Sequence, residues 1–152
     1  MNLDSTDKNI IMRLQEDCKQ TNKELSNALG LSVTAIYERV KKLEKEQIIQ
    51  KYVAVIDKDK IDKGFVAFCH IKLEKHAKDF VVKFEKEVCK LDEVLECYHI
   101  SGDYDYILKI LVKDMAAYRD FMVKKLTTID HIGSTHSTFM ISEVKQSSQI
   151  KF

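Results

Sequence analysis

The chain has 152 residues, of which 45% are hydrophobic and 32% are charged, as is ordinary for a globular protein of one or two small domains. No apolar run reaches the ~20 residues that a membrane helix needs, and the first residues lack the basic and apolar regions of a secretion signal, so we expect a cytoplasmic protein without membrane partners. The formal net charge of +1 excludes a protein that binds nucleic acid through its overall positive charge.

A first helix is predicted near the beginning of the chain. Asp4 or Ser5 can cap its amino end, and the residues alone leave both possibilities open. Ile10, Ile11 and Leu14 follow at helical spacing and form one apolar side. We expect this side to pack against the next two helices, which gives a three-helix head.

Two short helices joined by a glycine turn are predicted over residues 21–49. Thr21 and Glu24 have the spacing of a capping box, in which each side chain binds a free backbone N–H at the start of a helix. Gly30 follows the last apolar position, where the chain must adopt a left-handed conformation to end the helix. Ser32 can cap the helix that comes after it.

The second of these helices has two different faces. Ile36, Val40 and Leu43 form an apolar stripe, and polar and charged residues occupy the other side. A helix, a glycine turn and a polar-faced helix form the helix-turn-helix pattern, whose second helix fits the major groove of DNA. An ordinary pair of bundle helices has the same pattern, so this stretch alone leaves both readings open. The residues expected at a DNA interface are Ser32, Val33, Thr34, Tyr37, Glu38, Arg39, Lys41 and Lys42.

Positive charge is concentrated in one part of the sequence, at Arg39, Lys41, Lys42, Lys45 and Lys51. Contact with DNA phosphates needs such a local patch and does not need a basic domain. Ser32, Thr34 and Tyr37 are expected near base edges, and Lys41 and Lys42 near the phosphate backbone. Arg39 either joins the lysines or ties the head together. One copy with so few charges should bind DNA weakly, so we expect a dimer or a higher assembly.

Residues 48–57, IIQKYVAVID, are predicted to form a strand, because they are rich in β-branched and aromatic residues. A strand in this position is either a wing or a tether that leaves the head. The charged stretch KDKIDK ends in Gly64 and is the best domain boundary in the chain. We therefore expect a winged helix-turn-helix domain over residues 1–52, a strand and hinge over 53–64, and a second domain over 65–152.

The second half predicts the element order βαββαβ, which is the ferredoxin-like arrangement within an α+β protein. Its expected strands are residues 65–73, 94–100, 106–112 and 132–144, its expected helices are 78–91 and the segment that Asp114 caps, and residues 149–152 are an additional edge. Both helices should cover one face of an antiparallel sheet. The other face must also be covered, so we expect two copies to pair through their sheets.

The turn of the central hairpin, Gly102–Asp105, has the components of an amino-acid site. Backbone N–H groups at a glycine turn can hold an α-carboxylate, and Asp103 or Asp105 can accept hydrogen bonds from an α-ammonium group. The alternative is that Gly102-Asp103 simply makes a good hairpin turn.

Catalytic and metal-binding motifs are absent from the sequence. It has no Gly-x-Ser-x-Gly, no phosphate loop and no His-Glu-x-x-His, so we expect no enzyme and no catalytic residues. The four cysteines form no Cys-x-x-Cys pair and are expected to be small buried hydrophobes. A metal site that uses Cys97 with His99, or Cys69 with His70, is the alternative. We expect no metal and no cofactor other than an amino-acid effector.

The whole chain resembles the Lrp/AsnC family, the leucine-responsive or "feast/famine" transcriptional regulators. The stretches that carry the resemblance are Leu3–Asp17, Glu24–Glu44, Val94–Tyr106, Asp114–Met115 with Tyr118, and Glu143–Lys145. The spacing between these stretches is also that of the family. One departure is Gln47, which stands where relatives commonly have a glycine.

The resemblance implies a regulator that binds double-stranded DNA through its winged head. Its C-terminal RAM/ACT-like domain would bind an amino acid, and dimers would assemble into tetramers or octamers with the effector between them, beside the turn at residues 102–105. The effector-binding residues that it implies are Gly102, Asp103, Tyr104, Asp105, Met115, Thr135, His136 and Ser137. The alternative is a largely nonspecific, architectural DNA-binding assembly without an effector.

Overall fold

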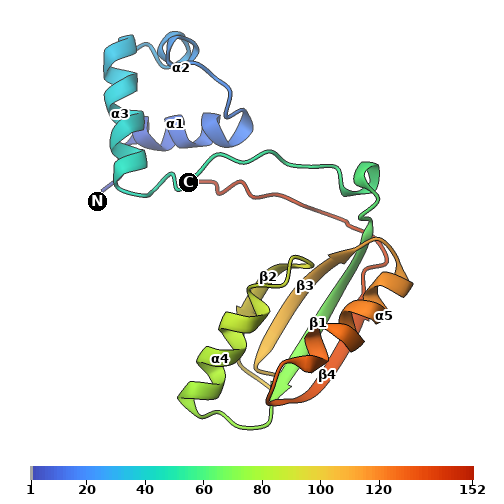
Figure 1. The fold of residues 1–152 in the computed structure, drawn as a ribbon. Coiled ribbons are helices and arrows are strands. Elements are labelled where there is room, and N and C mark those ends of the chain that lie inside the picture. The colour runs from blue at the N-terminus through green and yellow to red at the C-terminus, as the bar shows by residue number, and fades with distance from the viewer. Residues whose placement is uncertain (1) are drawn as a thin grey trace. The chain divides into compact units, whose positions relative to one another are not determined.

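Two structural units make up the chain (Figure 1). The computed structural model describes residues 2–152, and each unit has a buried core of its own. The first unit runs to Val55 and also contains Val144–Phe152, and the second unit is Ile56–Glu143. The domain boundaries expected from the sequence remain a prediction. No helix within residues 2–152 is long and apolar enough to cross a membrane.

The first unit contains the predicted three-helix head. Its helices are α1 (Ser5–Glu16), α2 (Asn22–Leu29) and α3 (Val33–Lys45). Ile10, Leu25, Ile36 and Leu43 are fully buried where the helices meet, which confirms the predicted apolar faces.

Side-chain caps define the ends of these helices. Asp4 is the residue that caps α1, because its carboxylate accepts the N–H of Asp7 at 2.8 Å. Thr21 and Glu24 form the predicted capping box of α2, and Gly30 ends that helix at φ +65°. The hydroxyl of Ser26 then donates to the carbonyl of Leu31 at 2.5 Å, which holds the turn before α3.

The strand predicted over residues 48–57 is wrong. Residues 50–57 pair with no strand among the residues that the structure describes, so a single chain forms no wing. The chain leaves α3 through Gln47 at φ +56°, a left-handed conformation that glycine adopts most readily, and Tyr52 donates to the Glu44 carboxylate at 3.1 Å. Val55 remains 80% exposed. The β-branched composition favours an extended backbone, but a strand also needs a partner for its backbone groups.

The second unit has the predicted βαββαβ order. Its elements are β1 (Phe65–Leu73), α4 (Lys78–Val88), β2 (Val94–His99), β3 (Tyr106–Val112), α5 (Met115–Lys124) and β4 (Ile132–Phe139), with short 3-10 turns η1 (Lys58–Ile61) and η2 (Leu126–Thr128). The bounds of β1 and β3 agree with the prediction, whereas α4 ends three residues early and β4 five. The additional edge predicted at residues 149–152 is wrong, because that segment forms no strand.

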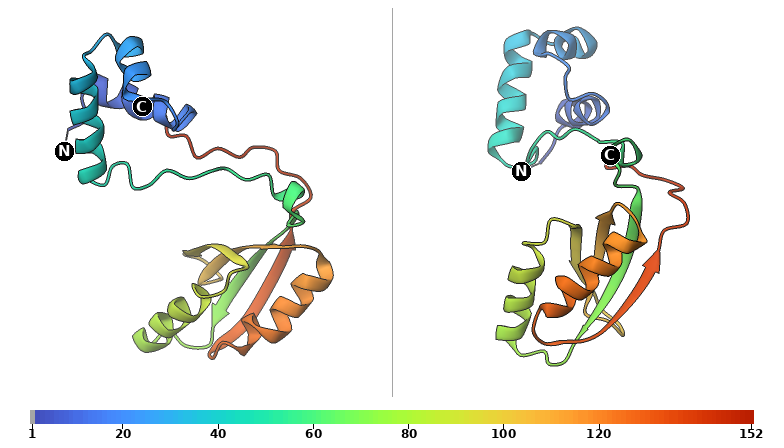
Figure 2. Two further views of the ribbon diagram at one scale, coloured as in Figure 1. Left: turned by 45° about the horizontal axis from the view of Figure 1, so that its top comes forward. Right: turned by 45° about the vertical axis from the view of Figure 1, so that its right-hand side comes forward.

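The strands form one antiparallel sheet in the order β2-β3-β1-β4. Alternation along β1 places Cys69 and Ile71 on one face, where both are fully buried. Helices α4 and α5 lie over this face (Figure 2), and Phe84 and Phe121 pack into its core. The predicted helix layer on one side of the sheet is therefore confirmed.

The opposite face of the sheet is not covered by any element of the same unit (Figure 2). Phe68 and His70 of β1 point to this face and are half-buried, and Tyr98 of β2 is 53% exposed. Pairing of two copies through this face remains a prediction.

Candidate nucleic-acid interface and ligand site

The exposed face of α3 carries most of the predicted DNA-binding residues. At about 100° per residue, Thr34, Tyr37, Glu38 and Lys41 fall on the side of the helix opposite the buried Ile36, and all four are exposed. Tyr37 is 50% exposed, and the neighbouring Val33 is 47% exposed. This face offers hydroxyl, carboxylate and ammonium groups that can reach base edges and phosphates.

Two of the predicted lysines have different surroundings. The Lys41 ammonium lies 3.2 Å from the Glu44 carboxylate and 5.9 Å from the centre of the Tyr37 ring. Lys42 is exposed and takes part in no ion pair within residues 2–152. Lys45, which belongs to the concentrated positive charge in the sequence but not to the predicted interface set, also lies on the exposed side of α3, four residues after Lys41.

Ser32 has a structural role at the start of α3. Its hydroxyl accepts the N–H of Ala35 at 3.1 Å, which caps the helix. The capping bond uses one of the two acceptor positions of this oxygen, and the hydroxyl proton remains for a contact with DNA.

Arg39 faces the head itself. Its guanidinium lies 2.7 Å from the Asp4 carboxylate and 2.6 Å from the Asp7 carboxylate. These hydrogen bonds raise the pKa of Arg39, and the N–H of Asp7 together with Arg39 lowers the pKa of Asp4. Of the two roles considered for Arg39, this geometry favours the one that ties α3 to α1.

The hairpin turn at residues 102–105 is held by backbone bonds at its base. The N–H of Asp105 donates to Ile71, and the N–H of Ile100 donates to the carbonyl of Asp105, both at 2.8 Å. Gly102 has φ +119°, a conformation that side chains rarely allow, and open space surrounds it. Backbone N–H groups near Gly102 are thus presented at an exposed tip.

Asp105 is engaged by its own chain. Its carboxylate accepts the N–H of Leu73 at 2.7 Å, and the imidazole Nε2 of His76 lies 2.7 Å away. Burial acts to raise the pKa of Asp105, but these two contacts outweigh it and leave the pKa below its ordinary value. Asp103, by contrast, is exposed and takes part in no ion pair within the described chain. Of the two aspartates predicted to accept an ammonium group, Asp103 is the one that remains accessible.

Tyr104 connects the turn to β4 on the uncovered face of the sheet. Its ring centre lies 5.3 Å from that of His70 and 6.1 Å from that of His136. His70 and His136 are paired across β1 and β4. The structure therefore brings Tyr104 of the turn close to His136. Thr135 is paired with Ile71 and points to the other face of the sheet.

Met115 and Ser137 belong to a different place, an apolar groove of about 690 Å³ between α5 and β4. Its lining residues are Met115, Ala116, Tyr118, Arg119, Met122, Val123, Ser137 and Phe139. The hydroxyls of Tyr118 and Ser137 share a hydrogen bond of 2.5 Å, and burial raises the pKa of Tyr118 to about 12. Ser137 therefore lies at the groove with its hydroxyl already paired.

The predicted effector residues thus form two groups in one chain. The turn precedes Tyr106 at the start of β3, and Met115 follows Val112 at the end of β3. Seven residues of β-strand span roughly 20 Å at ~3.4 Å per residue, so Met115 and the turn lie at opposite ends of the sheet. A single chain does not bring them to one small ligand.

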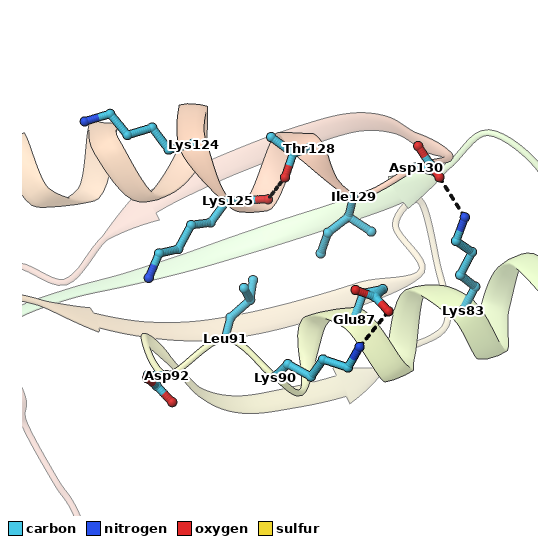
Figure 3. A pocket seen from close by; sticks show the side chains of 10 residues that line it. All are labelled: Lys83, Glu87, Lys90, Leu91, Asp92, Lys124, Lys125, Thr128, Ile129 and Asp130. Carbon is cyan, nitrogen blue, oxygen red and sulfur yellow. Dashed lines mark hydrogen bonds and ion pairs between the residues drawn. The ribbon is translucent and has the colours of Figure 1, made fainter.

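A second cavity, of about 450 Å³, lies between α4 and α5 (Figure 3). Four lysines and three acidic residues line it, and none of them belongs to the predicted effector set. Lys83 pairs with Asp130, and Lys90 pairs with Glu87, as Figure 3 shows. Since these charges compensate each other within the chain, the cavity has no marked preference for a charged ligand.

The cysteines offer no metal site. Within residues 2–152, no three His, Cys, Asp or Glu side chains are grouped so that they could hold a metal ion. Cys69 is fully buried, and burial raises the pKa of the Cys97 thiol to about 11. Both are poor sources of the thiolate that metals and electrophiles require.

Two family models match this chain. The model of the AsnC-type helix-turn-helix domain matches residues 3–44, and the model of the Lrp/AsnC ligand binding domain matches residues 66–150. The first range covers α1, α2 and all of α3 except its last residue, and the second covers α4, α5 and the sheet except the first residue of β1.

Sequence and structural relatives agree with these models. The leucine-responsive regulatory protein of Escherichia coli K12 is 39% identical over 148 residues, which cover 97% of this chain and 90% of that protein. A transcriptional regulator of Neisseria meningitidis, crystallised in complex with L-Met, is 32% identical and has a TM-score of 0.93 over 98% of this chain and 96% of its own. Escherichia coli AsnC is 26% identical, with a TM-score of 0.90 over 98% of this chain and 99% of its own.

Proposed function

Because the chain belongs to the Lrp/AsnC family of transcriptional regulators, which are not enzymes, we propose that it is a cytoplasmic, sequence-selective regulator of metabolism-related genes under the control of an amino-acid effector. The helix-turn-helix head and the ligand-binding domain are the two parts that such control requires. The observation that carries the proposal is the exposed polar face of α3, set on a head whose remaining surface charge is balanced.

Specificity resides in the middle of the α3 face. Thr34, Tyr37 and Glu38 are placed to meet base edges in the major groove, and a glutamate there accepts a hydrogen bond from the N4 amine of cytosine. Lys41 and Lys42 supply contacts with phosphates, which position the head but carry no sequence information. Arg39 supports this face indirectly, because its ion pair with Asp7 holds α3 on α1.

Assembly compensates for the small number of phosphate contacts. Two heads that bind two half-sites gain affinity because the second contact is intramolecular. The uncovered face of the sheet, with Phe68 and Tyr98, provides an apolar surface for pairing two copies. We expect dimers that associate further into tetramers or octamers.

The effector is bound between dimers, where two copies each contribute half of the site. The turn at residues 102–105 of one copy supplies backbone N–H groups and Asp103 for the α-carboxylate and the α-ammonium group. The groove at Met115 of another copy supplies the apolar wall for the side chain. The separation of these two groups within one chain supports a shared site, and the L-Met complex of the Neisseria relative supports an amino acid as the ligand.

Two experiments test the proposal. Selection from a randomised DNA library with the full chain should enrich a palindromic sequence, since two-fold symmetric dimers read symmetric half-sites. A pool that stays random would favour the alternative, an architectural protein that binds DNA without selectivity. A panel of the twenty amino acids should contain at least one that raises the melting temperature and changes light scattering. No response to any of them would reject the effector.

A further inference from the structure

The outer side of α1 carries another segment of the same chain, residues 149–152. The side-chain amide of Gln15 donates from Nε2 to the carbonyl of Ile150 at 2.9 Å, and its Oε1 accepts the N–H of Ile150 at 2.7 Å. One glutamine amide thus satisfies both backbone groups of one residue, as a neighbouring strand would. Gln149 adds a longer contact of 3.4 Å to the carbonyl of Gln15.

A second contact lies two helical turns away on the same side of α1. The ammonium group of Lys8 is 5.9 Å from the ring centre of Phe152, within the range of a cation–π interaction. Ile150 and Phe152 nevertheless remain 68% and 56% exposed. The segment is therefore held by a few polar contacts and not by burial, and each such bond shifts an equilibrium by only about three- to tenfold.

We propose that residues 149–152 act as a releasable latch on α1, with Gln15 as the residue that holds them. The docked latch gives the DNA-binding head a second connection to the ligand-binding unit. Docking itself requires neither DNA nor effector, so the latch is a property of the chain that goes beyond the proposed function.

The consequence of the latch follows from the course of the chain. The chain passes between the two units at Val55–Ile56 and again at Glu143–Val144. The second passage continues from β4, the strand that carries His136 and Ser137. When the latch is released, only the linker at residues 50–57 joins the head to the rest. When it is docked, two tethers restrict the head, which raises its effective concentration at a second half-site.

Hydrogen–deuterium exchange of the full chain tests the latch directly. In the wild type the amide of Ile150 should exchange at least several-fold more slowly than a free chain. Gln15→Ala should bring it to the free rate, and Gln15→Glu should have an intermediate effect, because a carboxylate accepts the Ile150 N–H but cannot donate to its carbonyl. Gln20→Ala is the matched control, since it removes an amide bond to the Arg13 carbonyl within the same head. It should leave Ile150 unchanged.

Free exchange of Ile150 in the wild type, or protection that persists in Gln15→Ala, would overturn the latch. Peptides from α1 report whether the head itself stays folded in each variant. If Gln15→Ala disturbs α1, a variant that ends at Ser148 is used in its place. In this variant the amides of α1 should exchange as in the wild type, except on the side where residues 149–152 dock.

DNA binding gives a second readout, which rests on the proposed function. Gln15→Ala should lower the affinity gain of a two-half-site DNA over a single half-site several-fold, and it should leave the single half-site affinity unchanged. An unchanged gain would overturn the restricting role of the latch. Absence of any DNA binding would instead reject the proposed function, while the exchange result would still stand.

Discussion

The Arg39 guanidinium of α3 lies 2.6 Å from the Asp7 carboxylate of α1, and the Asp7 side chain is only 8% exposed. A nearly buried carboxylate needs a counter-charge, because leaving it unpaired carries the full cost of its lost hydration. The pair also ties α3 to α1 within the head. In the sequence, Arg39 resembles a residue that contacts phosphate. In the structure, its guanidinium lies between α3 and α1.

Arg39→Ala should destabilise the head by about 1–3 kcal/mol, because it leaves the Asp7 carboxylate without its partner. Denaturant unfolding of the full chain measures this loss. Adding Asp7→Asn should recover part of the stability, since the orphaned charge is removed. The salt dependence of DNA binding by the folded fraction should remain that of the wild type. If the slope of log affinity against log salt were instead shallower by ~1 than in the wild type, Arg39 would be a phosphate contact.

Lys41→Ala combined with Lys42→Ala should weaken binding to all DNA sequences and flatten the plot of log affinity against log salt by ~1–2 units. The reason is that each lysine releases a counterion when it contacts a phosphate. Binding titrations at several salt concentrations measure the slope. Lys78→Ala with Lys86→Ala makes the same charge change on the exposed side of α4 and serves as the control. Equal slopes for the two double variants would remove Lys41 and Lys42 from the interface.

Glu38→Gln should alter base preference at one position of each half-site and leave the salt slope unchanged. The carboxylate is exposed on α3 and can only accept hydrogen bonds, whereas an amide can also donate. Competition with single-base variants of the selected site measures the change, which should be about 1–3 kcal/mol at that position. A uniform loss over all variants would show that Glu38 does not read a base.

Asp105→Asn should destabilise the protein at neutral pH by about 1–2 kcal/mol through weaker contacts with Leu73 and His76. Since the pKa of the folded carboxyl lies below its ordinary value, the contribution of Asp105 is complete above that ordinary value, near 4. It is lost as the pH falls through the lower, folded pKa. Melting curves of both proteins from pH 7 to pH 3 should therefore converge at the acid end, and a constant difference would contradict this role.

Mixing two defective variants tests the shared effector site. Asp105→Ala should abolish the effector response by releasing the turn, and Met115→Arg should abolish it by filling the groove at its 50% exposed position. Assemblies refolded from equal amounts of both should regain about one intact site in four, because each site takes its turn and its groove from different copies. Calorimetry with the effector counts these sites. No recovery would place the whole site within one chain.

Much of the fold could be predicted because its signals are local. The Thr21–Glu24 capping box, the left-handed Gly30 and the bounds of β1 and β3 depend on neighbouring residues or on simple alternation. The strand predicted at residues 48–57 failed, because pairing depends on a partner that composition does not reveal.

The candidate site also combines features that depend on local signals with features that depend on distant partners. The exposed face of α3 follows from helical spacing within one segment. The role of Arg39 could not be decided in this way, because its partners Asp4 and Asp7 lie 35 and 32 positions away. The separation of Met115 from the turn at residues 102–105, by contrast, follows from the predicted strand 106–112 that lies between them.

Sequence-selective DNA binding is the central claim, and the ratio of two dissociation constants tests it most directly. The full chain is titrated against its library-selected site and against a shuffled DNA of the same composition, at one physiological salt concentration. We predict that the selected site binds at least ~10³-fold more tightly, as is typical of specific regulators. A ratio near one would contradict the claim and leave an architectural DNA-binding protein.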